Sequence, residues 1–128
     1  MPHFIVEYTD NIKNEVNLAS LFEVVHQVLI SRDTFFPIGG IRSRGIELHD
    51  YRVADGAEDD AFIHAILKIG AGRPEELKNE VCEAIFGLMK EQYSELMSIR
   101  YLALSMELIE FSEAGTYKHN NIHARFKK

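Results

Sequence analysis

The second residue of the chain, Pro2, stands where its nitrogen could become a free amine. A small residue after the initiator methionine generally permits removal of that methionine, and Pro2 would then carry a secondary α-amine. An α-amine has an ordinary pKa of about 7.7–8.0, and burial or a neighbouring cation lowers this pKa by disfavouring the protonated form. Such an amine can act as a general base near neutral pH. A Met-Pro start is also common where it has no chemical meaning, so the dipeptide alone is weak support.

Two arginines could provide a binding site for carboxylates. Arg42 and Arg44 are two residues apart in a segment that is predicted to be extended, so both side chains project from the same side of a strand. A guanidinium binds a carboxylate through two parallel hydrogen bonds. On spacing alone, an equally good interpretation is an edge strand whose positive charges discourage aggregation.

A third arginine, Arg73, follows Gly70-Ala71-Gly72 where a helix is predicted to begin. The free N–H groups and the dipole at a helix N-terminus favour an anion nearby. Most Gly-x-Gly segments are ordinary strand-to-helix turns, and this one lacks the rest of a dinucleotide-binding or Walker motif. We therefore exclude nucleotide binding and keep Arg73 as a candidate anion-binding residue.

The remaining reactive side chains are weaker candidates. His119 and His123 have i, i+4 spacing, but they lie in a polar tail without an accompanying acid, so a solvated pair is expected rather than a metal site. We expect His64, on a strand, to be half-buried and hydrogen-bonded, and His26 to lie in the polar sector of a helix. Cys82 is most simply a packing residue. These side chains therefore give no reason to expect a metal site.

Composition narrows the class of protein. The 128 residues suit one domain, 1–128, and 46% of them are hydrophobic, which is ordinary for a globular protein. A net charge of −6 argues against a general nucleic-acid or anionic-membrane surface, because both partners need a basic face. The single cysteine cannot form an internal disulfide, and we find neither a signal peptide nor a spanning segment. A cytoplasmic protein is expected.

The elements that must position these residues follow from hydrophobic periodicity and from turn residues. In chain order we predict a strand at 2–8, a helix from 18 to about 31–33, an extended segment at 41–53, an acidic turn at 54–60, a strand at 61–69, a helix from 74 to about 96, a strand at 102–108 and a polar, basic tail at 113–128. Asn17 is the expected N-cap of the first helix.

This order is β-α-β twice, which predicts an α+β fold. Strands joined by a crossover helix are expected to pair in parallel, giving a four-stranded mixed sheet with both helices on one face. The order alone fits either a ferredoxin-like split β-α-β or a duplicated β-α-β unit. The strand at 61–69 is apolar on both faces, since Phe62 and Ile66 alternate with a second apolar set. Two helices cover only one face, so another copy of the chain is expected on the other.

Seven stretches of the chain resemble the 5-carboxymethyl-2-hydroxymuconate isomerases, a family of the tautomerase superfamily. They include Gly-Ile-Arg-Ser-Arg at 40–44 and Lys-Ile-Gly-Ala-Gly-Arg at 68–73, which are the specific ones. The others are at 2–7, 10–12, 36–37, 54–56 and 120–124, so the resemblance covers nearly the whole chain.

The resemblance implies two β-α-β units, a homotrimer and a cofactor-independent isomerase. It implies that Pro2 transfers a proton within 5-carboxymethyl-2-hydroxymuconate, a small polycarboxylate, to give the 2-oxo isomer during bacterial degradation of hydroxyphenylacetate-type aromatics. Arg42 and Arg73 map onto arginines of the substrate pocket, where they would hold carboxylates and stabilise enolate charge. Arg44 matches the motif with a less defined role.

Two other functions remain open from the sequence. One is a tautomerase-fold protein that acts on another enol or keto acid. The other is a non-catalytic module that binds an anionic metabolite through Arg42, Arg44 and Arg73, with no role for Pro2.

Overall fold

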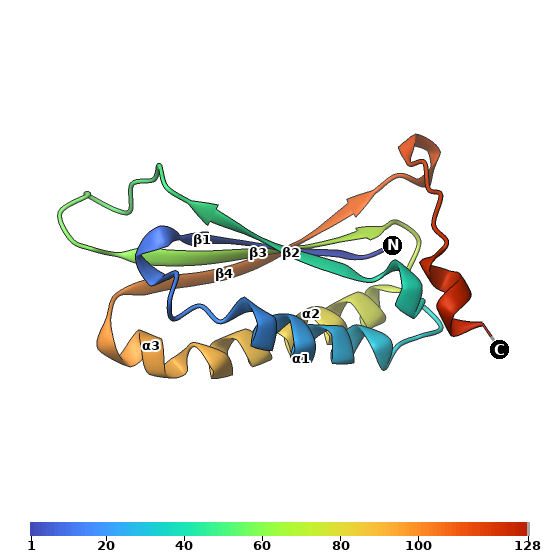
Figure 1. Cartoon of the computed structure of the whole chain (residues 1–128), viewed down its shortest axis with the longest axis horizontal. Helices are drawn as coiled ribbons and strands as arrows, with labels where there is room; N and C mark the ends of the chain where they lie inside the picture. Colours follow the sequence, from blue (N-terminus) through green and yellow to red (C-terminus); the bar gives the residue numbers. More distant parts are fainter. Residues whose placement is uncertain (128) are drawn as a thin grey trace.

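The computed structural model describes residues 1–127 and shows two layers, a four-stranded β-sheet and a layer of helices that covers one of its faces (Figure 1). The strands are β1 (His3–Thr9), β2 (Arg42–Leu48), β3 (Ala61–Gly70) and β4 (Leu102–Phe111), and the helices are α1 (Leu18–Ile30), α2 (Glu75–Gln92) and the short α3 (Ser94–Ile99). No helix within the described residues is both long enough and apolar enough to cross a membrane.

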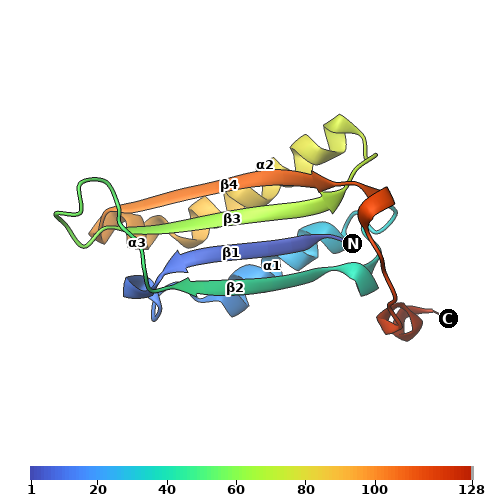
Figure 2. The same cartoon turned by 90° about the horizontal axis from the view of Figure 1, so that it is seen from above.

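The strand order decides between the two predicted architectures. β1 pairs in parallel with β2 and antiparallel with β3, and β3 pairs in parallel with β4, so the order is β2-β1-β3-β4 (Figure 2). In a split β-α-β unit another strand lies between the two that the helix connects. Here the strands that α1 connects are neighbours, and so are the strands that α2 and α3 connect. The duplicated β-α-β sheet with its helices on one face is confirmed, and the ferredoxin-like alternative is wrong.

The first helix forms where its apolar stripe predicts it. Asn17 is the N-cap, with its side chain accepting a hydrogen bond from the Ser20 N–H at 3.4 Å. Leu21, Val25 and Leu29 are buried against the sheet, as residues on one face of a helix should be. The predicted start of this helix is confirmed, and its end at Ile30 comes one to three residues before the predicted end near 31–33.

The second predicted helix is interrupted. α2 ends at Gln92, and α3 begins at Ser94, because Tyr93 leaves helical geometry with φ −102° and ψ 11°. The Tyr93 ring is buried, and its hydroxyl donates to the Val16 carbonyl at 2.7 Å. This hydrogen bond fixes a tyrosine between the sheet and the loop before α1, so the single helix that the sequence predicts to about residue 96 is wrong.

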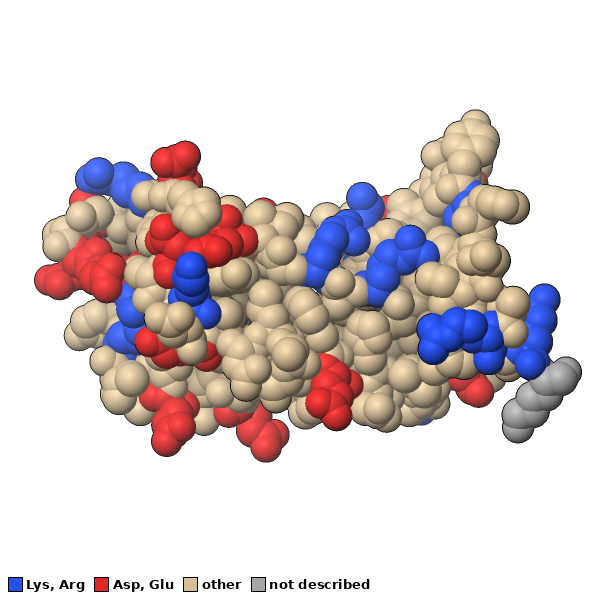
Figure 3. Space-filling model, viewed as in Figure 1, with Lys and Arg blue, Asp and Glu red and all other residues tan. Residues whose placement is uncertain are grey.

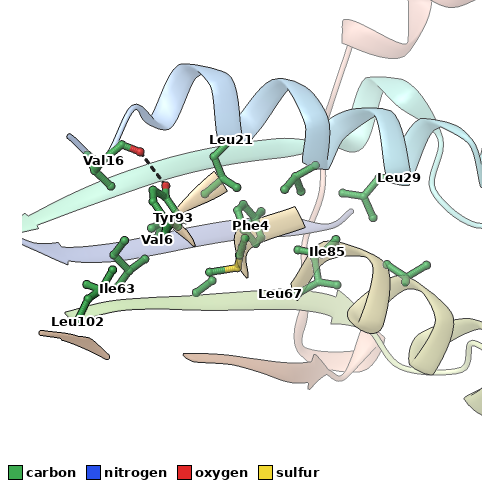
Figure 4. Close-up of a cluster of buried hydrophobic side chains, with 14 of the residues drawn as sticks. Phe4, Val6, Val16, Leu21, Leu29, Ile63, Leu67, Ile85, Tyr93 and Leu102 are labelled. Carbon is green, nitrogen blue, oxygen red and sulfur yellow. Dashed lines mark hydrogen bonds between the residues drawn. The ribbon is translucent and has the colours of Figure 1, made fainter. Parts of the chain in front are cut away.

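The core lies between the sheet and the helices (Figure 4). Phe4 and Val6 of β1 and Ile63 and Leu67 of β3 face the helices and are fully or almost fully buried. The ring of Phe4 meets that of Phe22 on α1 edge to face, with centroids 6.3 Å apart. This apolar layer holds the two central strands, and therefore the chain's amino terminus, in a fixed place.

The other face of the sheet is open in the single chain (Figure 1). Phe62 and Ile66 of β3 lie on it and are only half-buried, with Ile5 of β1 paired directly to Ile66. The face of β3 that packs on the helices is apolar as predicted, whereas on the open face Phe62 and Ile66 alternate with His64 and Lys68, so the prediction for that face is only partly correct. The extended segment is shorter than predicted, because strand β2 stops at Leu48 and residues 49–53 have no regular structure.

The tail is more ordered than its polar composition suggests. After β4, the chain turns through two short 3₁₀ helices, Glu113–Gly115 and Ile122–Phe126. The second of these lies against the 3₁₀ turn Ile38–Gly40 that precedes β2. The tail therefore returns to the end of the sheet at which the amino terminus lies (Figure 2).

Candidate active site

The amino terminus lies at the end of a central strand, enclosed by three other segments. Pro2 is buried, and its carbonyl accepts a hydrogen bond from the Arg42 N–H at 3.2 Å, which places Arg42 at the same level of the neighbouring strand. Met1 is half-buried. Around it lie the turn before β2, the segment between β3 and α2, and the tail.

Met1 lines two pockets. The first, of about 340 Å³, is lined by Met1 together with Arg73, Glu113, Lys118 and Asn120, and by residues of the neighbouring turn and tail. The second, of about 410 Å³, is lined by Met1, Arg42, His3 and the tail, again with Lys118 and Asn120. Met1, Lys118 and Asn120 are common to both pockets, whereas Arg73 lines only the first and Arg42 only the second.

Arg42 is exposed and contacts the amino terminus. Its Nη2 lies 3.5 Å from the Met1 sulfur. Apart from this contact, no hydrogen bond or ion pair of the Arg42 side chain is present in the part of the chain that the structure describes. Its guanidinium N–H donors therefore face the pocket and are available to a carboxylate.

Arg73 is used differently from the sequence expectation. Its Nε and Nη2 donate to the Phe35 carbonyl at 3.1 and 2.7 Å, and its Nη1 donates to the Gly70 carbonyl at 2.9 Å. The guanidinium also lies over the Phe36 ring, 4.6 Å from its centroid. Burial lowers the pKa of Arg73, and the carboxylate of Glu113 opposes this effect. The side chain thus fixes the loop before β2 while it lines the first pocket.

Arg44 lies outside both pockets that contain Met1. Its Nη1 lies 3.1 Å from the His3 Nδ1, and it lines a separate pocket of about 330 Å³ with Lys68 and Phe111. Burial, followed by the charges of Arg44 and Arg42, lowers the pKa of His3, so the neutral ring accepts the hydrogen bond from Arg44. The structure brings Arg42, Arg73 and the amino terminus together. Arg44 lies two residues further along β2 and lines a different pocket.

The tail contributes residues to which the sequence patterns assigned no role. Asn120 Nδ2 donates to the Gly39 carbonyl at 2.9 Å, and His123 lies directly on Gly39. A Cβ at Gly39 would stand 2.8 Å from the His123 backbone, so only a glycine allows this contact. The family resemblance of residues 120–124 was the one signal in the sequence that this segment matters. The polar residue types of the tail do not indicate that it packs against the glycine turn.

Positive charge surrounds the amino terminus of this acidic protein. On the face in view, Lys and Arg side chains gather toward the end of the molecule where both termini lie, and most Asp and Glu side chains lie elsewhere (Figure 3). Burial is the main cause that lowers the pKa of the Met1 amine. The charges of Lys118, Arg73 and Arg42 lower it further, and only the carboxylate of Glu113 opposes them. An amine at this position is therefore more easily deprotonated than an ordinary α-amine.

The other sequence candidates take structural roles. His64 lies 2.7 Å from the Ser105 Oγ and 3.0 Å from Glu107 Oε1, so the prediction of a hydrogen-bonded, half-buried histidine is confirmed. His26 is more enclosed than predicted, because its Nε2 lies 2.7 Å from the Ser43 Oγ of β2. Cys82 packs at the edge of the core, where burial raises the pKa of its thiol.

The predicted pair of solvated histidines is wrong for one member. His119 is exposed, but His123 is half-buried on the glycine turn. Within residues 1–127, no three His, Cys, Asp or Glu side chains lie close enough together to hold a metal ion.

Comparison with known proteins gives a consistent result over the whole length. The profile of the family described as 5-carboxymethyl-2-hydroxymuconate isomerase matches residues 2–126. A 5-carboxymethyl-2-hydroxymuconate Delta-isomerase of Escherichia coli is 45% identical over 127 residues, which are 99% of this chain and 100% of that protein.

Two solved structures extend the comparison. The crystal structure of a 5-carboxymethyl-2-hydroxymuconate isomerase from Deinococcus radiodurans R1 matches with a TM-score of 0.94 and 47% identity, covering 99% of this chain and 95% of that one. A fused 4-OT wild type, described as a symmetric trimer, matches with a TM-score of 0.59 and 19% identity over 91% of this chain and 93% of its own. The second likeness is one of fold.

Proposed function

The chain belongs to the 5-carboxymethyl-2-hydroxymuconate isomerase family, and from this we propose that it converts 5-carboxymethyl-2-hydroxymuconate to its 2-oxo isomer by proton transfer through Pro2. Membership in a family of isomerases favours catalysis over a non-catalytic anion-binding module. The reaction would serve the degradation of hydroxyphenylacetate-type aromatics, and a cytoplasmic location without nucleic-acid or membrane partners stays a prediction.

The chemistry requires a base, an acid and a place for anionic charge. With Met1 removed, the Pro2 amine would take the proton of the 2-hydroxyl group and return a proton to a carbon of the conjugated system. No atom is gained or lost, because the dienol and the ketone are isomers. Negative charge develops on the oxygen in between, and the guanidinium groups of Arg42 and Arg73 would stabilise it and hold the carboxylates.

The observation that carries this proposal is that Met1 lines both the pocket that contains Arg73 and the pocket that contains Arg42. Removal of Met1 would join them into one cavity, with Arg42 on one side, Arg73 on the other and the new Pro2 amine between them. An elongated dicarboxylate chain could then span both arginines while its centre lies over the amine. Arg44 would act at a greater distance, by holding His3 beside Arg42.

We also propose that the working unit is a homotrimer. The open face of the sheet carries Ile5, Phe62 and Ile66 without a covering layer, and a second copy is the simplest cover for such a surface. The symmetric trimer of the fused 4-OT protein shows that this fold can assemble in threes.

The deciding experiment is an ultraviolet assay with 5-carboxymethyl-2-hydroxymuconate on protein whose amino terminus has been verified by intact mass. Protein that has lost Met1 should convert the substrate, and protein in which processing is blocked should lose most activity, because the Pro2 nitrogen is then an amide. A circular dichroism spectrum serves as the folding control. Full activity with Met1 shown to be present would exclude Pro2 as the base.

A second substrate class needs a separate assay. A panel of other enol acids, tested on the same processed protein, separates this activity from that of a tautomerase-fold protein with a different substrate. Higher kcat/KM for another enol acid would move the proposal to that acid and leave the role of Pro2 unchanged.

A further inference from the structure

A third cation shares the cavity around the amino terminus, although no sequence pattern pointed to it. Lys118, in the tail, lines both pockets that Met1 lines, whereas Arg42 lines only one of them and Arg73 only the other. Lys118 therefore shares a pocket with each arginine and with Met1, and it comes from a different segment of the chain.

The position of Lys118 is fixed by its neighbours. Its Nζ lies 3.1 Å from Glu113 Oε2, and 37% of the side chain is exposed. The tail on either side is tied down, since Thr116 Oγ1 donates to the Ser112 carbonyl at 2.7 Å and Asn120 holds the Gly39 carbonyl. An ammonium has three N–H donors, so the ion pair with Glu113 leaves donors free for a ligand in the cavity.

The proposed substrate has three carboxylates, and two arginines would hold only the two at the ends of its chain. Its muconate chain carries a carboxylate at each end, and the carboxymethyl group branches from the side. Arg42 and Arg73, on opposite sides of the amine, suit the ends of the chain. Arg73 has already given three N–H donors to backbone carbonyls and has few left for a second carboxylate.

From this arrangement we infer that Lys118 binds the carboxylate of the carboxymethyl branch and so makes the enzyme selective for a tricarboxylate over the unbranched 2-hydroxymuconate. The inference rests on the proposed function and adds the residue that recognises the carboxylate of the branch. Electrostatics agree with the placement: among the neighbouring charges, that of Lys118 has the largest effect on the pKa of the Met1 amine.

The test compares the two substrates on processed, full-length protein. Lys118→Met keeps most of the length of the unbranched side chain and removes its charge. For 5-carboxymethyl-2-hydroxymuconate we expect KM to rise and kcat/KM to fall roughly 10- to 100-fold, the range for losing one charge-assisted hydrogen bond. For 2-hydroxymuconate we expect less than about a 3-fold change. Measurements at a pH above the amine's apparent pKa keep the deprotonated fraction constant.

Three further variants separate the charge of Lys118 from the effects of its neighbours. Lys118→Arg should restore the preference for the tricarboxylate. The double variant Lys118→Met with Glu113→Gln should lose the preference as fully as the single variant, which excludes repulsion by an unpaired Glu113. Lys90→Met is the matched control, because Lys90 lies on α2 over the Phe86 ring and should leave both substrates unaffected.

Two results would overturn the role of Lys118. Equal losses on both substrates would show that it acts through the amine or the fold of the tail, and no loss on either would show that it does not bind substrate. If the unmodified enzyme converts neither substrate, the proposed function fails, but the binding role of Lys118 can still be tested.

The test is calorimetry with propane-1,2,3-tricarboxylate and with pentanedioate. Selective loss of tricarboxylate binding in Lys118→Met would support the binding role of Lys118, and unchanged binding would refute it.

Discussion

At the scale of single residues, the two pocket arginines differ in what else they hold. Within residues 1–127, the Arg42 guanidinium has one polar contact, with the Met1 sulfur, and it projects from the end of strand β2. Arg73 holds two carbonyls and stacks on Phe36, so it fixes the loop that carries the glycine turn. Replacing Arg73 should therefore cost more stability than replacing Arg42, and the sequence motifs could not distinguish these two roles.

This difference predicts different outcomes for the two alanine substitutions. Arg42→Ala should reduce kcat/KM by the equivalent of roughly 1.5–3 kcal/mol and leave the free energy of unfolding nearly unchanged. Arg73→Ala should reduce kcat/KM and also lower the free energy of unfolding by about 0.5–1.5 kcal/mol, because the exposed Phe35 carbonyl and the part-buried Gly70 carbonyl lose their donors. Steady-state kinetics and urea denaturation measure both quantities. Unfolding of Arg42→Ala without a separate kinetic defect would show that Arg42 is structural.

The environment of the amine predicts a pH profile. Burial, Lys118 and the two pocket arginines lower the pKa of the Met1 amine, and the proposed Pro2 amine would lie one residue further along, near the same charges. We expect kcat/KM to rise with pH through an apparent pKa below the ordinary value of about 7.7–8.0. Removing a cation must raise that pKa, so Arg42→Ala should shift the profile upward, and Glu113→Gln should shift it downward. A pH profile that stays flat from acid to alkaline conditions would contradict an amine base.

At the scale of elements, prediction from sequence succeeded where a pattern repeats locally. The stripe of α1 and its cap at Asn17 depend on residues close in sequence, and they were correct. The break after α2 depends on the buried Tyr93 and its bond to Val16, which lies 77 positions away in the chain. No local pattern contains that contact. No local pattern predicts the packing of the tail either, because it depends on the absence of a Cβ at Gly39, far away in the sequence.

The glycine turn gives a test at this scale. Gly39→Ala should push His123 and the tail away, because the new Cβ would stand within 2.8 Å of backbone atoms that cannot easily move. We expect a fall in kcat/KM of at least about 10-fold, since Lys118 and Asn120 leave the cavity with the tail. Limited proteolysis should also cleave the tail faster.

A glycine elsewhere in the chain provides the control. Gly87→Ala, in α2, meets no atom within 4 Å and should leave kinetics and tail cleavage unchanged. It should raise helix stability slightly, because alanine is the better helix former. Normal activity and a protected tail in Gly39→Ala would show that the tail does not close the site.

At the scale of the whole molecule, one side of the sheet has its cover and the other does not. The helices bury the inner residues of the two central strands, while Ile5, Phe62 and Ile66 remain half-buried on the outer side. The apolar alternation of β3 in the sequence was sufficient to predict this imbalance. It was not sufficient to give the number of copies, which depends on how two curved surfaces fit together.

The proposed trimer predicts a sharp effect of one charge. Light scattering should give three times the chain mass of 14.7 kDa for the unmodified protein. Ile66→Lys should give the mass of a single chain, because an unpaired ammonium at the centre of an apolar contact is costly to desolvate. Gln27→Lys, on the exposed side of α1, is the control and should stay assembled. A trimer that survives Ile66→Lys would place the contact elsewhere.

The central place of β1 in the sheet sets a time limit on the maturation of the chain. His3 is paired with Arg42 on one side and Lys68 on the other, so the first strand to leave the ribosome cannot settle until about 70 residues have been made. At 5–20 residues per second, this leaves roughly 4–14 s in which the first residues are extended and accessible. After folding, Met1 is half-buried between the glycine turn and the tail. For Pro2 to serve as the proposed base, an aminopeptidase would therefore have to remove Met1 during synthesis, and we expect chains that fold before this processing to keep Pro2 capped.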